Sequence, residues 1–208
     1  MRRDNATAVT DPRGLTTTYT YDGLDDLIQE TSPDTGTTTY AYDAAGNRTS
    51  RTDARGVIVH YTYDTLNRLK TIDYPDDGLD MTLTHDRCPN GIGRLCEMRD
   101  GSGTTAYAYD PRGNLTTQTV TVGGMTQTLG YAYDGADQLI RITYPSGRTV
   151  EYSRDIAGRI ASVTTPLGGV TQALAGDIEY QPFGPIQGRG RCDVGRGRGA
   201  PDAGPGAT

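Results

Sequence analysis

A pair of tyrosines two residues apart, followed at once by aspartate, recurs along this chain and constrains its fold more than any other feature. Five copies are intact and include ten of the fourteen tyrosines. The motif residues are Tyr19, Tyr21, Asp22, Tyr40, Tyr42, Asp43, Tyr61, Tyr63, Asp64, Tyr107, Tyr109, Asp110, Tyr131, Tyr133 and Asp134. Because self-similar units at a fixed period are typical of repeat architectures, we expect one array and not a globular domain.

One unit predicts a β-hairpin, as the copy that begins at Tyr107 illustrates. Residues i and i+2 of a strand lie on one face, so Tyr107 and Tyr109 project together. The segment 110–114 contains Asp, Pro, Gly and Asn, which favour turns, and the Thr/Val run after Leu115 suits a strand. No helical period of apolar residues is found. The predicted fold class is all-β, a tandem β-hairpin repeat strip.

Three weaker copies extend the array. They are Leu83-Thr84-His85-Asp86, Tyr152-Ser153-Arg154-Asp155 and Glu179-Tyr180-Gln181. An aliphatic residue stands five positions after most of the aspartates, at Leu27, Leu69, Leu115, Leu139 and Ile160, whereas the second unit has Arg48 there. Residues 1–187 are therefore predicted to form an array of about eight units.

The composition changes after Gln187. Residues 188–208 are rich in Gly, Arg, Pro and Ala and contain no aromatic residue. Such a segment buries too little apolar area to offset its ordering entropy, so we expect a disordered C-terminal tail.

Charge and hydropathy bear on partners and location. The net charge of −6 argues against nucleic acid or an anionic membrane as partner, and the basic tail lacks aromatics for base stacking. No apolar run of about 18 residues is present, so no membrane insertion is expected. The N-terminal segment Met1-Arg2-Arg3-Asp4-Asn5 does not resemble a signal peptide.

Two cysteines lie in the degenerate unit after Asp86. The dipeptide Asn90-Gly91 favours a hairpin turn between Cys88 and Cys96, which would bring them onto facing strands as a candidate disulfide. The alternative is a pair of free thiols on a surface loop. A structural zinc site is disfavoured because these cysteines and His85 supply only three ligands.

The sequence offers little for catalysis, so we expect no catalytic, cofactor-binding or metal-binding residues, no cofactor, and no enzyme. The repeated aspartates either line up to bind a cation or begin turns, and the turn interpretation is favoured. Asp76, Asp77 and Asp80 likewise suggest a turn and not a calcium loop. The tyrosine rows either form a structural aromatic ladder or stack on sugar rings.

These motifs resemble those of the Rhs/YD-repeat family. Tyr-x-Tyr-Asp followed by x-x-Gly-x-Leu matches the family's unit, as do the cysteine unit 85–96 and the segment 180–185. The resemblance covers residues 8–187. It implies a strip of hairpins that coils into a hollow β-shell, or cocoon, enclosing a C-terminal toxin that is delivered to competing cells. The repeats of such a protein are scaffold.

The expected function is therefore that of a non-enzymatic scaffold segment of such a shell, with the rest of the shell and its toxin tip as partners. The resemblance implies a parent protein that is secreted or at the cell surface. About eight units are too few to close a shell, which indicates a fragment. The alternatives are an extracellular or cell-surface module that binds carbohydrate or protein, with glycans as ligands, and a non-functional gene fragment.

Overall fold

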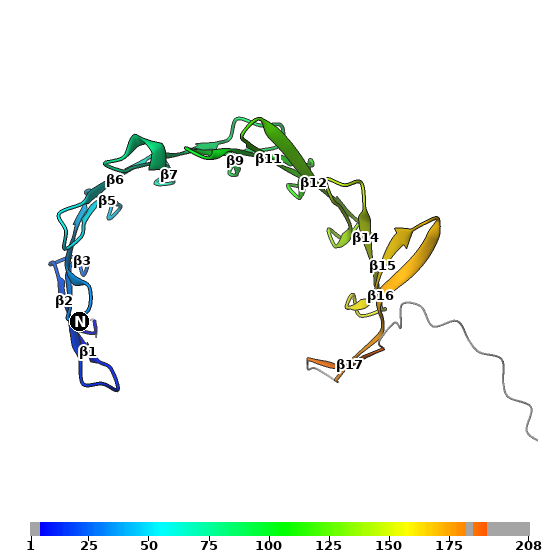
Figure 1. Cartoon of the computed structure of the whole chain (residues 1–208), viewed down its shortest axis with the longest axis horizontal. Coiled ribbons are helices and arrows are strands. Elements are labelled where there is room, and N and C mark those ends of the chain that lie inside the picture. The colour runs from blue at the N-terminus through cyan, green and yellow to red at the C-terminus, as the bar shows by residue number, and fades with distance from the viewer. Residues whose placement is uncertain (1–4, 182–184, 191–208) are drawn as a thin grey trace, which may run out of the picture. The chain divides into compact units, whose positions relative to one another are not determined.

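The computed structural model describes residues 5–181 and 185–190 of the 208-residue chain. The described segments are almost entirely β-strands and turns. The chain divides into two compact units, Met1–Gln127 and Thr128–Thr208, which are described separately. Both are built from antiparallel hairpins (Figure 1), so the prediction of an all-β hairpin strip is confirmed.

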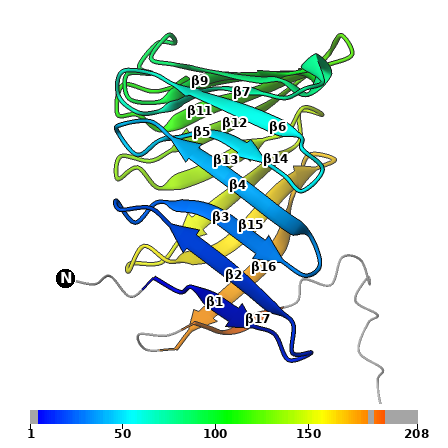
Figure 2. The same ribbon diagram turned by 90° about the vertical axis from the view of Figure 1, so that its left-hand side faces the viewer.

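In the first unit, each strand pairs antiparallel with the next, from β1 to β11. Figure 2 shows β2 to β6 following one another in a regular zigzag. The strands are β1 (Ala8–Thr10), β2 (Thr16–Tyr21), β3 (Leu27–Ser32), β4 (Gly36–Tyr42), β5 (Arg48–Thr52), β6 (Ile58–Tyr63), β7 (Leu69–Asp73), β8 (Met81–His85), β9 (Leu95–Asp100), β10 (Gly103–Tyr109) and β11 (Leu115–Val122). A single turn of 3-10 helix, η1 (Asp77–Leu79), stands between β7 and β8 where no helix was expected.

The second unit begins within β12 (Met125–Tyr133), and its strands also pair in chain order. They are β13 (Leu139–Thr143), β14 (Thr149–Arg154), β15 (Ile160–Leu167), β16 (Val170–Tyr180) and β17 (Ile186–Gly190). Strand β17 extends to Gly190, so the first three residues of the predicted tail belong to a strand. The rest of that tail, 191–208, lies outside the described residues.

The two faces of the sheet in the first unit differ in chemistry. In β2, β4 and β6 the motif tyrosines are half-buried on one face, here called the tyrosine face. The opposite, threonine face is more exposed and contains cross-strand hydroxyl pairs, such as Thr31–Thr37 at 3.1 Å and Thr62–Thr71 at 2.6 Å. This alternation follows from the period of two along a strand.

The core is thin. Among the described residues only Val59, Gly91, Cys96, Val150 and Thr165 are buried. A one-layer sheet has no second layer to cover its side chains, so the large tyrosine rings and their neighbours supply much of the buried area. No helix within the described segments is long and apolar enough to cross a membrane.

Each motif also marks an irregularity of register. The ladder shifts by a bulge at the second tyrosine position, for example between Ala41 and Tyr42 and between Thr62 and Tyr63. There the aromatic residue faces the residue five positions after the aspartate, so that Tyr42 pairs with Arg48. Because bulges raise the local twist and bend the strand, a bulge in every repeat gives each hairpin the same irregularity.

Candidate functional site

In at least three of the five intact motifs, the second tyrosine joins its hairpin to the preceding one. Its hydroxyl donates to a backbone carbonyl at the start of the preceding hairpin's second strand: Tyr42 to Leu27 O at 2.8 Å and Tyr63 to Arg48 O at 3.0 Å. Tyr109 donates to Leu95 O at 2.7 Å. The ladder is locally disrupted by the bulge at this position, and the phenol adds a hydrogen bond there. We call this hydrogen bond the tyrosine tie.

One degenerate repeat makes the same tie with a different side chain. Arg154 occupies the second tyrosine position, and its Nη2 donates to Leu139 O at 3.0 Å. Its Nη1 also donates to Gly158 O at 3.1 Å. Arginine is a long side chain with several donors, so it reaches the carbonyl that tyrosine reaches elsewhere. The degenerate motif therefore preserves the joint.

The aspartate of the motif organises the turn that follows it. At Asp43 the backbone N–H donates to Asn47 O at 2.9 Å, and the side-chain Oδ1 accepts from the N–H groups of Ala45 and Asn47, both at 2.9 Å. The side-chain amide of Asn47, and then its backbone N–H, lower the pKa of Asp43. The same carboxylate contacts are made by Asp22, Asp64, Asp110, Asp134 and Asp155, and at the opposite edge by Asp11 and Asp53.

These contacts leave the aspartates occupied by backbone donors. Among the described residues there is no group of three or more His, Cys, Asp or Glu side chains arranged to hold a metal ion. In the acidic cluster, Asp76 accepts from Gly78 N–H at 3.0 Å and Asp80 accepts from Tyr74 N–H at 2.8 Å. The cluster thus shapes the connection around η1.

Arg68 links two successive repeats. Its Nε donates to Asp64 of its own turn at 2.8 Å, while its two terminal nitrogens contact both oxygens of Asp86 in the next repeat, Nη1 at 3.0 Å. Asp86 also accepts from Gly93 N–H at 2.6 Å. Arg68, and then the Gly93 N–H, lower the pKa of Asp86 to about 2.

Cys88 and Cys96 form a disulfide with Cα atoms 5.6 Å apart. It closes the longer loop that replaces the short aspartate turn in this repeat. Two side chains of the loop contact the next repeat: Asn90 donates to Tyr109 O at 2.9 Å, and Arg94 donates to Gly113 O at 3.1 Å. The loop is thus cross-linked within itself and hydrogen-bonded to its neighbour.

Arg48, the exception in the aliphatic row, lies between two tyrosine rings of successive repeats. Its guanidinium carbon is 5.4 Å from the Tyr40 ring centroid and 5.1 Å from that of Tyr61. Both distances fit cation–π contacts, and Arg48 itself is exposed. Tyr40 and Tyr61 are the first tyrosines of their motifs, so the aromatic ladder contains an arginine at this point.

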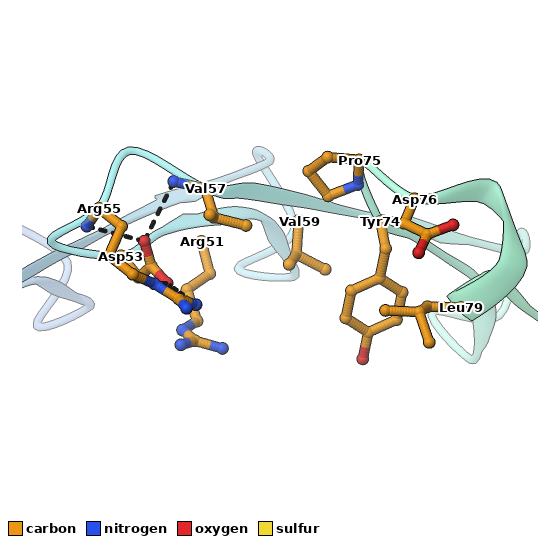
Figure 3. Close-up of a pocket in the computed structure, with 9 residues that line it drawn as sticks. All are labelled: Arg51, Asp53, Arg55, Val57, Val59, Tyr74, Pro75, Asp76 and Leu79. Atoms are coloured by element: carbon orange, nitrogen blue, oxygen red, sulfur yellow. Dashed lines mark hydrogen bonds and ion pairs between the residues drawn. The ribbon is translucent and has the colours of Figure 1, made fainter.

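A pocket of about 310 Å³ is hollowed into the tyrosine face (Figure 3). Val57 and Val59 of the β5–β6 hairpin form one part of its lining, and Tyr74 and Leu79 of the connection around η1 form another. Arg51 stands at its side, paired across the strands with Val59. No sequence motif indicated this pocket, because its walls are 15 or more residues apart and only the connection before β8 brings them together.

Solved structures show the same fold. One is a Tc holotoxin pore of Photorhabdus luminescens with a TccC3 variant, with a TM-score of 0.69 over 86% of this chain and 11% of that chain. A TcdB2-TccC3-Cdc42 structure has a TM-score of 0.66 over 83% of this chain and 11% of that one. TcdB2-TccC3 without its hypervariable C-terminal region also gives 0.66, over 86% and 12%.

Each of these structures is 17% identical to this chain, so the likeness concerns the fold. The chain spans about 11% of the length of the first solved chains that it matches. Among curated proteins, none matches its sequence. The RHS Repeat family model, however, matches residues 2–37, 21–58, 42–78, 90–125 and 133–170, well over half of the sequence. The chain belongs to the RHS repeat family.

Proposed function

We propose that this chain is a non-enzymatic scaffold segment of an RHS shell whose parent protein encloses and delivers a C-terminal toxin in competition between bacteria. Its partners are then the remaining repeats of the shell and the toxin tip. The parent protein is secreted or placed at the cell surface, where delivery to another cell begins.

The observation that carries the proposal is the repeated joint between hairpins. The tyrosine tie connects at least three hairpins to their predecessors, and Arg154 makes it in a repeat where the tyrosine is lost. This hydrogen bond has a structural role. Because it can be repeated at every hairpin, it suits a wall that is extended one hairpin at a time. Stability in an array of this kind is approximately a sum over repeats and nearest-neighbour contacts. The family match and the likeness to Tc toxin structures support the same function.

The test is to isolate the native protein with antibodies raised against the chain. We expect a polypeptide much longer than 208 residues, found in the medium or on the cell surface. Trypsin should spare the segment that follows the array in the native protein and degrade it once urea has unfolded the array. Substituting both Tyr42→Ala and Tyr63→Ala in the parent should weaken this protection, whereas Thr20→Ala on the threonine face should not.

A native product that ends with the array and binds glycans on a carbohydrate array would contradict the proposal and favour the binding-module alternative. A long parent whose C-terminal segment is cleaved equally fast before and after unfolding would also contradict it, because that segment would then lie outside any shell.

A further inference from the structure

The pocket beside η1 results from an elaboration of one repeat. The connection between β7 and β8 contains seven residues, 74–80, whereas β5 and β6 are joined by five and β3 and β4 by three. Gly78 packs against the neighbouring turn so closely that a Cβ on Gly101 would overlap the Gly78 carbonyl oxygen. This packing holds the longer connection in place, with Leu79 beside the tyrosine face.

The lining is apolar and partly open to water. Val59 is only 5% exposed and Tyr74 is half-buried, but Leu79 is 60% exposed. Figure 3 shows both side chains projecting from the same side of the sheet as Val59. Burying such apolar surface under a ligand is favourable in proportion to the area removed from water. The volume, about 310 Å³, is at the small end of ligand pockets and fits one large side chain.

A cation completes the pocket. In Figure 3, Arg51 lies across Val59 from Tyr74 and Leu79. Arg55, by contrast, is bound to Asp53, with its Nη2 2.7 Å from Oδ2. Within the described part of the chain, the Arg51 side chain has no hydrogen-bond or ion-pair partner. The other carboxylates of the two pockets have partners of their own, since Asp76 accepts from Gly78 N–H and Glu30 accepts from the Tyr40 hydroxyl. A guanidinium beside an apolar surface is suited to bind a carboxylate, because it is weakly hydrated and can donate two parallel hydrogen bonds.

The groove continues beyond Arg51. A second pocket, of about 470 Å³, shares Arg51, Asp53 and Arg55 with the first and is lined further on by Thr38 and Tyr40. Two adjoining pockets that share the Arg51 side chain fit a chain that presents every second side chain to the same face. An extended peptide does this, with alternate side chains on opposite sides.

We propose that this groove binds an extended peptide in which a large apolar residue and an acidic residue are separated by one residue, so that both side chains face the sheet. The apolar side chain fills the pocket between Val59, Tyr74 and Leu79, and the carboxylate pairs with Arg51. The remainder of the peptide continues over Tyr40. This site does not depend on whether the chain belongs to a shell, so its failure and the failure of the proposed function are separate outcomes.

The test is an NMR titration of the full ¹⁵N-labelled chain with N-acetyl-Phe-Gly-Glu-amide and its neutral isostere N-acetyl-Phe-Gly-Gln-amide at low salt. We expect amide shifts at Val57, Val59 and Leu79, and the acidic peptide should bind about twofold to fivefold more tightly. Arg51→Gln should abolish that difference without changing the affinity for the neutral peptide. Leu79→Ser should weaken both.

Matched controls are Arg99→Gln, an exposed arginine on the threonine face, and Leu66→Ser, an exposed leucine in an aspartate turn. Neither should change binding, and unchanged spectra away from the pocket show that each variant is folded. Equal affinities for the two peptides, or shifts scattered over all exposed apolar residues, would overturn the site. Equally tight binding of 3-phenylpropionate would overturn the peptide assignment and favour a small apolar acid.

Discussion

The turn after Asp43 and the longer loop after Asp86 occupy equivalent places in the repeat but are stabilised differently. The first spans five residues and is closed by one carboxylate that accepts two backbone N–H groups. The second spans 86–94 and contains the disulfide, with Arg68 and the Gly93 N–H on the carboxylate of Asp86. Both begin with the same closure, in which the aspartate N–H donates to the last carbonyl, at 2.9 and 3.1 Å.

The comparison shows which part of the repeat tolerates change. The loop length differs, yet the tyrosine of the following hairpin makes the same tie, Tyr63 after the short turn and Tyr109 after the long loop. Because closing a longer flexible loop costs more entropy, the long loop has a covalent cross-link where the short turn needs only hydrogen bonds. The joint between hairpins is thus independent of the turn.

Removing the cross-link should have the largest effect. In a Cys192→Ser background, we expect Cys88→Ser with Cys96→Ser to lower the free energy of unfolding by about 2–3 kcal/mol, as the nine-residue closed loop implies. Urea unfolding followed by tyrosine fluorescence measures it. Reductant should destabilise the Cys192→Ser chain to the same extent and leave the chain that also carries Cys88→Ser and Cys96→Ser unchanged. An unchanged urea midpoint would show that the loop's other contacts suffice.

Glycine substitutions should separate two kinds of constraint. Gly46 in the short turn has a φ of +81° and open space around it, so Gly46→Ala should cost about 1–2 kcal/mol through backbone strain alone. In the long loop, a Cβ on Gly91 would overlap both disulfide sulfurs. Gly91→Ala should therefore be more harmful with the disulfide intact than in the Cys88→Ser, Cys96→Ser variant, as a double-mutant cycle can measure. Equal costs in both backgrounds would contradict this.

Loss of the tie should affect both regions alike. Tyr63→Phe and Tyr109→Phe each remove one hydroxyl donor and should each cost about 1 kcal/mol in urea unfolding. Tyr107→Phe serves as the matched control because it is the other tyrosine of the same motif. A cost at Tyr109 several times that at Tyr63 would mean that the long loop has changed the joint.

The smallest expected difference between the two regions is in how acid pH changes their contributions to stability, through Asp43 and Asp86. The folded-state pKa of Asp86 is lowered from 3.8 to about 2, so the stability that it contributes is present above pH 4 and lost as the pH falls from about 4 towards 2. Asp86→Asn should reduce the change of the urea midpoint with pH over this window, and Asp43→Asn should reduce it less. A steeper profile in the Asp86 variant would reverse the sign and refute the role of Arg68.

The sequence predicted the hairpins because period-two patterning and Asp/Gly turn residues act locally. The strand around Tyr40 and the turn after Asp43 follow from residues within five positions of each other. The tie from Tyr42 to Leu27 does not, because it joins residues 15 positions apart through a carbonyl, which every residue possesses. Arg154 could have indicated the tie from the sequence, because a side chain that donates hydrogen bonds replaces the tyrosine at the same position of the motif. The pocket depends on the packing of one long connection and has no periodic signature.

The direction of the tyrosine tie has a consequence for how the protein is made. Every donor lies C-terminal to its acceptor, so a hairpin leaving the ribosome finds the carbonyl it needs on a hairpin already formed. The contacts are close in sequence, which favours rapid folding. Hairpins can therefore fold one after another during synthesis. Each new hairpin can dock on the previous one as soon as about twenty further residues have left the ribosome.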